Sequence, residues 1–531
     1  MSLMARSAVP APFSIAPSWN WSGNDGSWST FEIAVGTPPQ SFHILPATGS
    51  SEVWVPIPQA CEGVMINVPN CGLLRGVEEG RGFETNASSS WDLLGIYELE
   101  AEQNLWGPTG NPGQYGLDKV TLEAYPSGQS VHLAEQTVAG YATANAWVGN
   151  LGLGISVGSF ADVHKGTVPS LLDAMKSQNL TSSLSFGYAA GASYSSPRDY
   201  GSLILGGYDK ARFEPSNLNF SITGTDSKAL PLNIVSVIAE NTLNGTLSLL
   251  PDASSITTVI DSTISQMWLP ADVCELFAEA FGLTYDETTG LYLVKSAAHR
   301  ELVQNNPKVT FTVSSVNGSS ATTNIELPYA AFDLQAGMPM FNASTNYFPL
   351  RRAANESQQV LGRAFLQEAY IFVDWERDYF TIGQSIHQND TTNIVPVLSP
   401  AYDSGNDADS SGLSTGAIVG LAIGACAVIA AFIGVAALMV IRSRRRRRDA
   451  ERLKTDLPTE LHSEHIKPPE IMSAQVYEMN SGETSRHELS ENAKPLIELQ
   501  ASTPESELDG DGERYGRYGW DKKPNTYYEL P

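Results

Sequence analysis

An internal duplication is the feature that most constrains how this chain can fold. The segment FHILPATGSSEVWVP begins at Phe42, and a related segment, TVIDSTISQMWLP, begins at Thr258. When Ala47 is aligned with Asp261, each copy has an apolar run before that position, a hydroxyl residue directly after it, and Trp and Pro at matching later positions. Each copy predicts a buried strand, a tight turn and a second apolar strand. The chain therefore contains two related halves, with a carboxylate at the turn of one half and a methyl group at the turn of the other.

Short strand-like runs bounded by turn residues continue on both sides of the duplicated segments, and few stretches have a helical pattern. We predict helices over residues 168–177 and 271–281. Many short strands, few helices and a two-fold repeat predict an all-β fold with two lobes. The domain is expected to span residues 26–385, with lobes at about 26–210 and 211–385.

A single apolar segment predicts a membrane anchor. Residues 416–441 form an uncharged run of 26 residues, longer than the roughly 20 that span a bilayer. A cluster of arginines follows it, and the positive-inside rule places the residues after that cluster in the cytoplasm. A nuclear signal is the other interpretation of the arginines, and their position beside a spanning helix argues against it. The membrane is therefore a predicted partner, in a single-pass type I topology.

Asparagine sequons support the same topology. Nine N-x-S/T sites lie before the apolar segment and none lies after it, which predicts a glycosylated domain outside the cell or in a lumen. The predicted location is the plasma membrane or the secretory and vacuolar pathway. The first residues lack the apolar core of a signal peptide, so either the start is misplaced or the membrane helix directs targeting. The nine sites are Asn20, Asn86, Asn179, Asn219, Asn244, Asn317, Asn342, Asn355 and Asn389.

The remaining segments are polar. We expect an N-terminal segment (1–25), a disordered acidic stalk (386–415) and a disordered cytoplasmic tail (442–531). Within the membrane segment, a repeated G-x-x-x-G pattern permits close pairing of two helices. Small residues are also common in membrane helices that do not pair, so the dimer and the monomer both stay open. The glycines of the pattern are Gly416, Gly420 and Gly424.

Charge and cysteines limit the function further. The formal net charge of −26 argues against a nucleic-acid partner, because phosphate binding needs a basic surface. Cys61 and Cys71 lie in one loop and are expected to form a disulfide in this compartment. Cys274 lies on the second predicted helix, either as a buried apolar residue or as a reactive thiol. No metal or cofactor signature is recognised, and we predict neither; the isolated pair His462 and His465 in the tail is attributed to chance.

Several segments, in order, resemble one enzyme family. They are VGTPPQSFHILPATGSSEVWVP, LGLGI, SLILGGYD, IDSTISQMWLP and LGRAFLQEAYIFVDWERDYFTIG. Together they resemble the pepsin-like aspartic peptidases, in a membrane-anchored fungal-type branch, over about residues 28–384. The resemblance implies a bilobal fold and a cleft in which two aspartates, one from each lobe, share a proton and activate a water against a peptide bond.

The match departs from the family at the catalytic positions. The first Asp of the family corresponds to Ala47, whereas Asp261 occupies the second. After Asp261, Thr263 stands where the family has Gly, and Ile264 stands where it has a hydroxyl residue. The resemblance also implies that the hydroxyls of Thr48 and Ser262 cross-link the two turns. We expect Asp261 to be a structural carboxylate hydrogen-bonded within its turn.

The flap expected over the cleft departs as well. The family has a flap tyrosine supported by a tryptophan, and the candidates here are Tyr97 and Trp54. Glu98-Leu99-Glu100 follows Tyr97 where the family has glycines. The assignment of Tyr97 is therefore a guess from position alone.

Three functional hypotheses follow from these observations. The first is a membrane-anchored pseudoprotease whose interlobe cleft binds a peptide, a protein or a cell-wall polymer, because a cleft between β lobes suits a strand-like ligand. The alternative is an active aspartic-type endopeptidase that cleaves surface proteins at acid pH with Asp261 and a substitute group. The third is a surface glycoprotein with a structural role. Cleavage separates the second hypothesis from the others, and saturable peptide binding separates the first from the third.

Overall fold

The structure is a computed structural model, and most of the expected domain lies in its described part. The predicted membrane helix, the tail and Asn389 lie outside the described residues. Within the described part of the chain, no helix is both long enough and apolar enough to cross a membrane. The described residues are 9–66, 68–99, 111–156, 158–160, 167–216, 218–222, 230–251, 254–318, 320–387 and 391–403.

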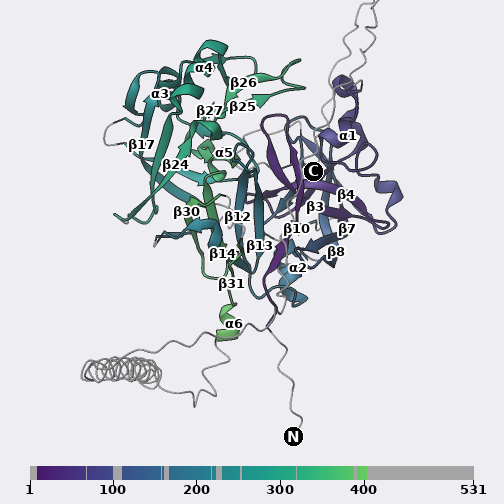
Figure 1. Cartoon of the computed structure of the whole chain (residues 1–531). Helices are drawn as coiled ribbons and strands as arrows, with labels where there is room; N and C mark the ends of the chain where they lie inside the picture. Colours follow the sequence, from purple (N-terminus) through teal and green to yellow (C-terminus); the bar gives the residue numbers. More distant parts are fainter. Residues whose placement is uncertain are drawn as a thin grey trace, which may run out of the picture. The chain divides into compact units, whose positions relative to one another are not determined.

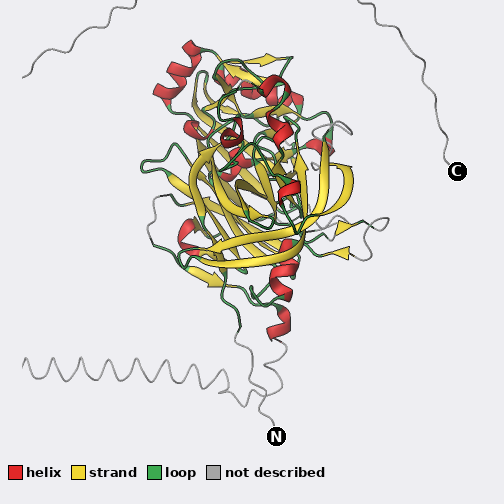
Figure 2. Ribbon diagram, turned by 90° about the vertical axis from the view of Figure 1, so that its right-hand side faces the viewer, coloured by secondary structure: helices red, strands yellow, loops and turns green. Residues whose placement is uncertain are grey.

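Strands are the predominant regular structure and the helices are short, so the fold expected to be all-β is mostly β with short helices (Figure 2). In the N-terminal half, β3 and β4 form a hairpin with its turn at residues 36–39, and the two long strands β7 and β8 pair beside them. The strands of this half are β1 Phe13–Ile15, β2 Pro17–Ser22, β3 Trp28–Val35, β4 Gln40–Ala47, β5 Val53–Pro56, β6 Asp92–Glu98, β7 Pro112–Ala124, β8 Gln129–Tyr141, β9 Gly149–Gly152, β10 Gly158–Ser159, β11 Thr167–Val168, β12 Ser185–Ala192, β13 Asp199–Leu205 and β14 Gly207–Asp209.

The C-terminal half has its own sheet, in the order β24-β23-β17-β19-β28-β20-β27, with β18 paired to β17. A smaller sheet, β21-β22-β26-β25, packs beside it. The strands are β15 Phe213–Glu214, β16 Asn219–Ser221, β17 Pro231–Thr242, β18 Gly245–Ser248, β19 Ile256–Ile260, β20 Met267–Leu269, β21 Leu283–Asp286, β22 Leu291–Val294, β23 Lys308–Ser314, β24 Thr322–Pro328, β25 Leu334–Ala336, β26 Thr345–Phe348, β27 Leu350–Arg352, β28 Val360–Leu361, β29 Ala369–Asp374, β30 Tyr379–Ser385 and β31 Ile394–Pro396.

The two halves share a sheet. Strand β29 of the C-terminal half pairs with β12 of the N-terminal half, with Phe186 opposite Val373, so the order β30-β29-β12-β13 runs without a break (Figure 1). One hydrophobic core extends through both halves, from Phe13 to Ile382. Because the halves share main-chain hydrogen bonds and a core, the turns that they contribute to a common site are held in a fixed geometry.

Both predicted helices are present, and the start of one is corrected. Helix α3 covers the predicted range 271–281, whereas α2 begins later than expected. The side chain of Ser170 accepts a hydrogen bond from the amide of Asp173 and caps α2, and Val168 pairs in β11 instead. Helix α4 was not predicted. The helices are α1 Cys71–Leu74, α2 Leu171–Ser177, α3 Ala271–Phe281, α4 Ser296–Asn305, α5 Arg363–Leu366 and α6 Pro400–Asp403.

Both ends of the domain extend beyond the predicted bounds of 26–385. Strand β1 inserts between β13 and β7, and β2 pairs with β3, so residues 13–22 belong to the sheet. At the other end, β31 pairs with β14. The prediction of disorder is therefore wrong for the described stretch 391–403. The signal was missed because Ile394–Pro396 is too short to show a strand pattern by itself.

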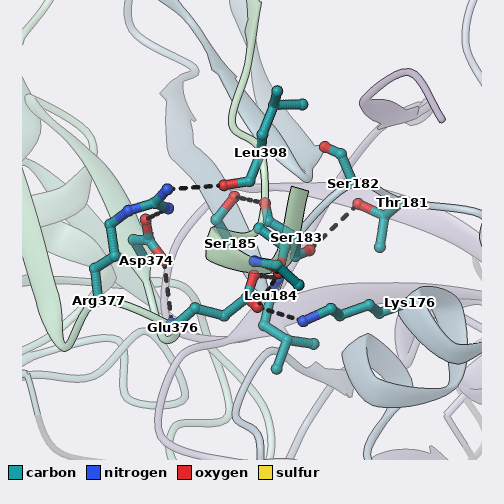
Figure 3. Close-up of polar contacts among 12 residues, drawn as sticks. Lys176, Thr181, Ser182, Ser183, Leu184, Ser185, Asp374, Glu376, Arg377 and Leu398 are labelled. Carbon is teal, nitrogen blue, oxygen red and sulfur yellow. Dashed lines mark hydrogen bonds and ion pairs between the residues drawn. The ribbon is translucent and has the colours of Figure 1, made fainter. Parts of the chain in front are cut away.

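A polar cluster attaches this C-terminal stretch to both halves (Figure 3). Glu376 accepts hydrogen bonds from the Lys176 ammonium group, from the amide of Leu184 at 2.9 Å and from the hydroxyl of Ser399 at 2.7 Å. Arg377 donates to the carbonyl of Leu398 at 3.0 Å. Burial raises the pKa of Glu376, but the hydrogen bonds from Lys176, Ser399 and Leu184 outweigh it and lower the pKa below its usual value.

Candidate functional site

Two turns, one from each half, face each other at the centre of the domain. Strand β4 ends at Ala47 and β19 ends at Ile260, so both turns directly follow a buried strand. The amide of Thr48 donates to the hydroxyl of Ser262 at 3.0 Å, and the amide of Ser262 donates to the hydroxyl of Thr48 at 2.9 Å. The Ser262 hydroxyl in turn donates to the carbonyl of Pro46 at 2.7 Å. These reciprocal hydrogen bonds fix the two turns relative to each other.

The strand arrangement behind each turn is the same in both halves. Strand β9 lies parallel to β4 and antiparallel to β5, and β28 lies parallel to β19 and antiparallel to β20. Each of these inner strands leads into a glycine, Gly152 in one half and Gly362 in the other. At Gly362 an added Cβ would lie 2.5 Å from the carbonyl oxygen of Ile264, so only glycine allows this close approach to the turn. The match between Leu151-Gly152 and Leu361-Gly362 in the sequence therefore has a structural basis.

Asp261 is deeply buried, and only one of its two carboxylate oxygens accepts a hydrogen bond from the described residues. Its side chain is 1% exposed, and its Oδ1 accepts a hydrogen bond from the amide of Thr263 at 2.8 Å. Its Oδ2 is buried and accepts no hydrogen bond from the described residues. Burial raises the pKa of Asp261, although the hydrogen bonds of Thr263 and the positive charge of Arg363 act in the opposite direction. The neutral acid is thus favoured over a wider pH range than for an exposed aspartate.

The position that matches Asp261 in the facing turn is occupied by Ala47. This residue is fully buried at the end of β4, and its carbonyl accepts a hydrogen bond from the amide of Leu153 at 2.9 Å. Between the two positions lies Gly49, where an added Cβ would lie 2.6 Å from the carboxylate of Asp261. The main chain of one turn therefore packs against the single carboxylate of the other.

An arginine that was not singled out in the sequence lies behind the turn of Asp261. The side chain of Arg363 is 6% exposed, and its Nη1 donates to the carbonyls of Ser262 at 2.7 Å and Thr263 at 3.1 Å. Its guanidinium group lies 5.0 Å from the ring centre of Trp28. Burial lowers the pKa of Arg363, and the nearby carboxylate of Asp25 opposes this shift. Its place directly after Leu361-Gly362 was the available signal, because that segment returns the chain to the turn.

The flap candidate Tyr97 lies on the β6–β7 hairpin, with Gly113 opposite it. Its ring packs edge-on against Tyr115, with ring centres 5.5 Å apart, and its hydroxyl donates to the carbonyl of Leu94 at 3.5 Å. The indole N–H of Trp54 donates to Glu52 at 3.2 Å, and the hydroxyl of Tyr115 donates to the same carboxylate oxygen at 3.1 Å. The described tyrosine that is linked to Trp54 through Glu52 is therefore Tyr115, which the sequence did not indicate.

The cysteines and sequons can also be placed. Cys61 and Cys71 form the expected disulfide, which joins α1 to the loop after β5. Cys274 is buried, and burial raises its pKa to about 12, which argues against a reactive thiol. The eight sequon asparagines within the described residues are all exposed: Asn20, Asn86, Asn179, Asn219, Asn244, Asn317, Asn342 and Asn355.

A pocket of about 520 Å³ lies beside the two turns and is lined from both halves. Its position follows from the strand pairing, because Leu45 and Asn150 line it and pair with each other two positions before Ala47 and Gly152. We refer to it as the inter-half pocket. Its lining includes Asp25, Leu45 and Asn150 from the N-terminal half, and Ile264, Arg351 and Arg363 from the C-terminal half.

The chemistry available at the turns is limited. One carboxyl group can accept or donate one proton, whereas peptide hydrolysis through an activated water needs a base and an acid together. Across the described ranges, no group of three His, Cys, Asp or Glu side chains is arranged to hold a metal ion. The two facing turns therefore carry one carboxyl group, that of Asp261, and one methyl group, that of Ala47, at matching positions.

Comparison with known proteins identifies the family. The chain is 23% identical to secreted aspartic protease 1 of Candida albicans over 370 residues, covering 68% of this chain and 82% of that protein. It is 22% identical to the aspartic proteinase yapsin-3 of Saccharomyces cerevisiae over 396 residues (71% and 70%) and 26% identical to cathepsin E of Mus musculus over 348 residues (64% and 76%). The model of the family described as eukaryotic aspartyl protease matches residues 30–385. The chain belongs to the eukaryotic aspartyl protease family.

Proposed function

We propose that this protein is a catalytically inactive member of the family that binds an extended peptide between its two halves. Ala47 is the observation that carries the proposal. It occupies the position that matches Asp261 across the reciprocal hydrogen bonds of Thr48 and Ser262, and a methyl group cannot share a proton. In the proposed state Asp261 is a neutral, structural acid, in agreement with its raised pKa.

The surroundings of Asp261 support this proposal. The main chain at Gly49 packs directly against the carboxylate, and the residue at 263 has a side chain where the family pattern has none. Thr263 and Ile264 are both buried; the amide of Thr263 donates to Asp261, and Ile264 packs against Val360.

We further propose that the domain is the extracellular or lumenal part of a single-pass membrane glycoprotein. The eight exposed sequon asparagines are accessible to a glycosyl transferase, and one relative is named as a secreted protease. The apolar residues 416–441 would form the anchor. Loss of mass on treatment with an N-glycosidase, together with extraction from membranes only by detergent, would support this location. A protein of unchanged mass in the soluble fraction would contradict it.

Peptide binding without turnover is the experiment that tests the proposed function. Fluorescein-labelled decapeptides of mixed sequence are incubated with the full-length protein, and anisotropy reports binding while chromatography reports cleavage. We expect saturable binding and intact peptides. The variant Met340→Trp, at a lining residue of the inter-half pocket, should weaken binding at least tenfold. The matched control Val303→Trp, at an exposed position of α4, should bind as the parent does.

The other outcomes separate the alternatives. Binding that is absent for every peptide would contradict the proposal and favour a structural role or a polysaccharide ligand. Peptides that are cleaved by the parent and not by Asp261→Asn would show an active endopeptidase that uses one aspartate. Binding that is equal in Met340→Trp and the parent would place the ligand elsewhere on the molecule.

A further inference from the structure

The inter-half pocket has an unusual electrostatic character for a chain with a net charge of −26. The charged residues that line it are Asp25, Arg351 and Arg363, so its formal charge is +1. Both arginines lie against tryptophan rings that also line the pocket. The guanidinium carbon of Arg363 is 5.0 Å from the ring centre of Trp28, and that of Arg351 is 5.4 Å from the ring centre of Trp268.

The two guanidinium groups have donors to spare. Arg351 makes no hydrogen bond or ion pair through its side chain with any described residue, and its Nε is buried without a partner. Arg363 uses only Nη1, for the two carbonyls of the Asp261 turn, and its Nε is likewise buried without a partner. The indole nitrogen of Trp268 is a third buried donor without an acceptor in the described chain. The Nη atoms of Arg351 and Nη2 of Arg363 also have no acceptor among the described residues, so these guanidinium groups can donate to a ligand.

The one carboxylate that lines the pocket, that of Asp25, already accepts hydrogen bonds from neighbouring side chains. Asp25 accepts hydrogen bonds from the indole of Trp28 at 2.9 Å, from the hydroxyl of Ser265 and from the side-chain amide of Gln266 at 3.1 Å. In the described part of the chain no ion pair joins it to Arg351 or Arg363, although its charge acts to raise the pKa of both. Asp25 thus links the N-terminal segment to the loop after Asp261, and neither arginine has an anion hydrogen-bonded to it among the described residues. An unpaired guanidinium in a largely buried place is destabilising, which argues that a ligand completes it.

We infer that the inter-half pocket recognises an acidic side chain, a Glu or Asp carboxylate, of the bound peptide. This inference rests on the proposed peptide-binding function and specifies the ligand. A volume of about 520 Å³ accommodates an acidic residue and its neighbour. The carboxylate would accept from the Nη atoms of Arg351 and from Nη2 of Arg363, and the flanking residue would stack on Trp268 or Trp147.

Three matched peptides test this inference. They are labelled octapeptides of one alanine-rich sequence with Glu, Gln or Lys at the centre, titrated against the full-length protein. We expect the Glu peptide to bind at least tenfold more tightly than the Gln peptide, and the Lys peptide to bind weakest. The preference of Glu over Gln should fall as salt is raised from 50 to 500 mM, because part of it is a charge interaction.

Variants assign the preference to the pocket. Arg351→Gln should remove most of the preference for Glu while the Gln peptide still binds. Arg352→Gln is the control, because it removes the same charge one position away and Arg352 instead contacts Tyr292 and Glu275 outside the pocket lining. Arg363→Gln is a second test, and its folding is checked first by near-ultraviolet circular dichroism because Arg363 also supports the Asp261 turn.

Each outcome is decisive. Equal binding of the Glu and Gln peptides would overturn the inference and leave the proposed peptide binding intact. A preference for Glu that persists in Arg351→Gln would overturn the assignment to this pocket. Failure of all three peptides to bind would overturn the proposed function and the inference together. The inference stands if the preference for Glu is lost in Arg351→Gln and retained in Arg352→Gln.

Discussion

The geometry of the two turns depends most directly on the hydroxyl group of Thr48. It accepts the amide hydrogen of Ser262 at 2.9 Å, and both residues are fully buried. Thr48→Ala would leave that amide without an acceptor, so we expect a loss of about 1–3 kcal/mol in the free energy of unfolding. Urea denaturation at pH 6 measures this loss of unfolding free energy. The control Thr257→Ala removes an exposed hydroxyl and should cost less than about 0.5 kcal/mol; similar losses in the two variants would contradict this role.

His387 should make the stability of the domain depend on pH above neutrality. Its ring nitrogens lie 3.0 Å from a carboxylate oxygen of Asp199 and 3.1 Å from one of Glu368. Burial lowers its pKa, but the two carboxylates outweigh burial and raise the pKa from 6.5 to about 9. The stabilisation is therefore complete below about pH 6.5 and is lost as the pH rises through about 9.

The variant His387→Gln measures this contribution. Between pH 6.5 and 9.5 we expect the parent to lose about 2 kcal/mol more than the variant, after allowance for the partial exposure of the imidazole. Chemical denaturation across this range, at constant ionic strength, gives the two profiles. Parallel profiles would show that the imidazole is not held charged by its two carboxylates.

At the scale of elements, residues 391–403 attach to the rest of the domain through Glu376. The pKa of Glu376 lies below its usual 4.5, so its contribution is present above that value and is lost as the pH falls. Glu376→Gln should therefore lower the free energy of unfolding by about 1–2 kcal/mol at pH 7 and by much less at pH 3. The control Glu326→Gln removes an exposed ion pair with Lys308 and should have little effect at either pH. An equal loss at both pH values would rule out an ionised Glu376 as the cause.

Elements with a hydrophobic pattern in their own sequence were predictable. Elements that form only because they pair with strands far away in the sequence were not. The turns at Ala47 and Asp261 carry their own signal, because each is an apolar run followed by turn residues. Strand β1, Phe13–Ile15, is too short to have a pattern and exists because β13 and β7 pair with it on either side. Strand β31 is missed for the same reason.

The same distinction holds for the site. The facing of Thr48 and Ser262 was expected from the family resemblance, because the duplicated pattern places one in each half. The cluster of Asp25, Arg351 and Arg363 was not expected, because Asp25 lies more than 300 residues before the two arginines and no sequence pattern links the three. Only the folded chain brings these charges to one pocket.

At the scale of the whole molecule, a carboxylate introduced at position 47 should produce little proteolytic activity. Ala47→Asp would place an ionisable group at a fully buried position, so we expect a loss of about 2 kcal/mol or more in stability. Thr263 and Ile264 would still follow Asp261 in its turn, where the family pattern has a glycine and a hydroxyl residue. Cleavage of a denatured protein by Ala47→Asp should therefore stay near background. Vigorous cleavage at acid pH would show that Ala47 is the single defect of the site.

The most direct test of inactivity is a digestion of denatured protein by the purified full-length chain, read by mass spectrometry from pH 3 to 7. The variant Asp261→Asn runs beside it, because it removes the remaining carboxylate of the two turns. Our account predicts the same peptides, at background level, from the parent and the variant at every pH. New cleavage products that appear with the parent and vanish with Asp261→Asn would contradict it and show that one aspartate suffices for peptide hydrolysis here.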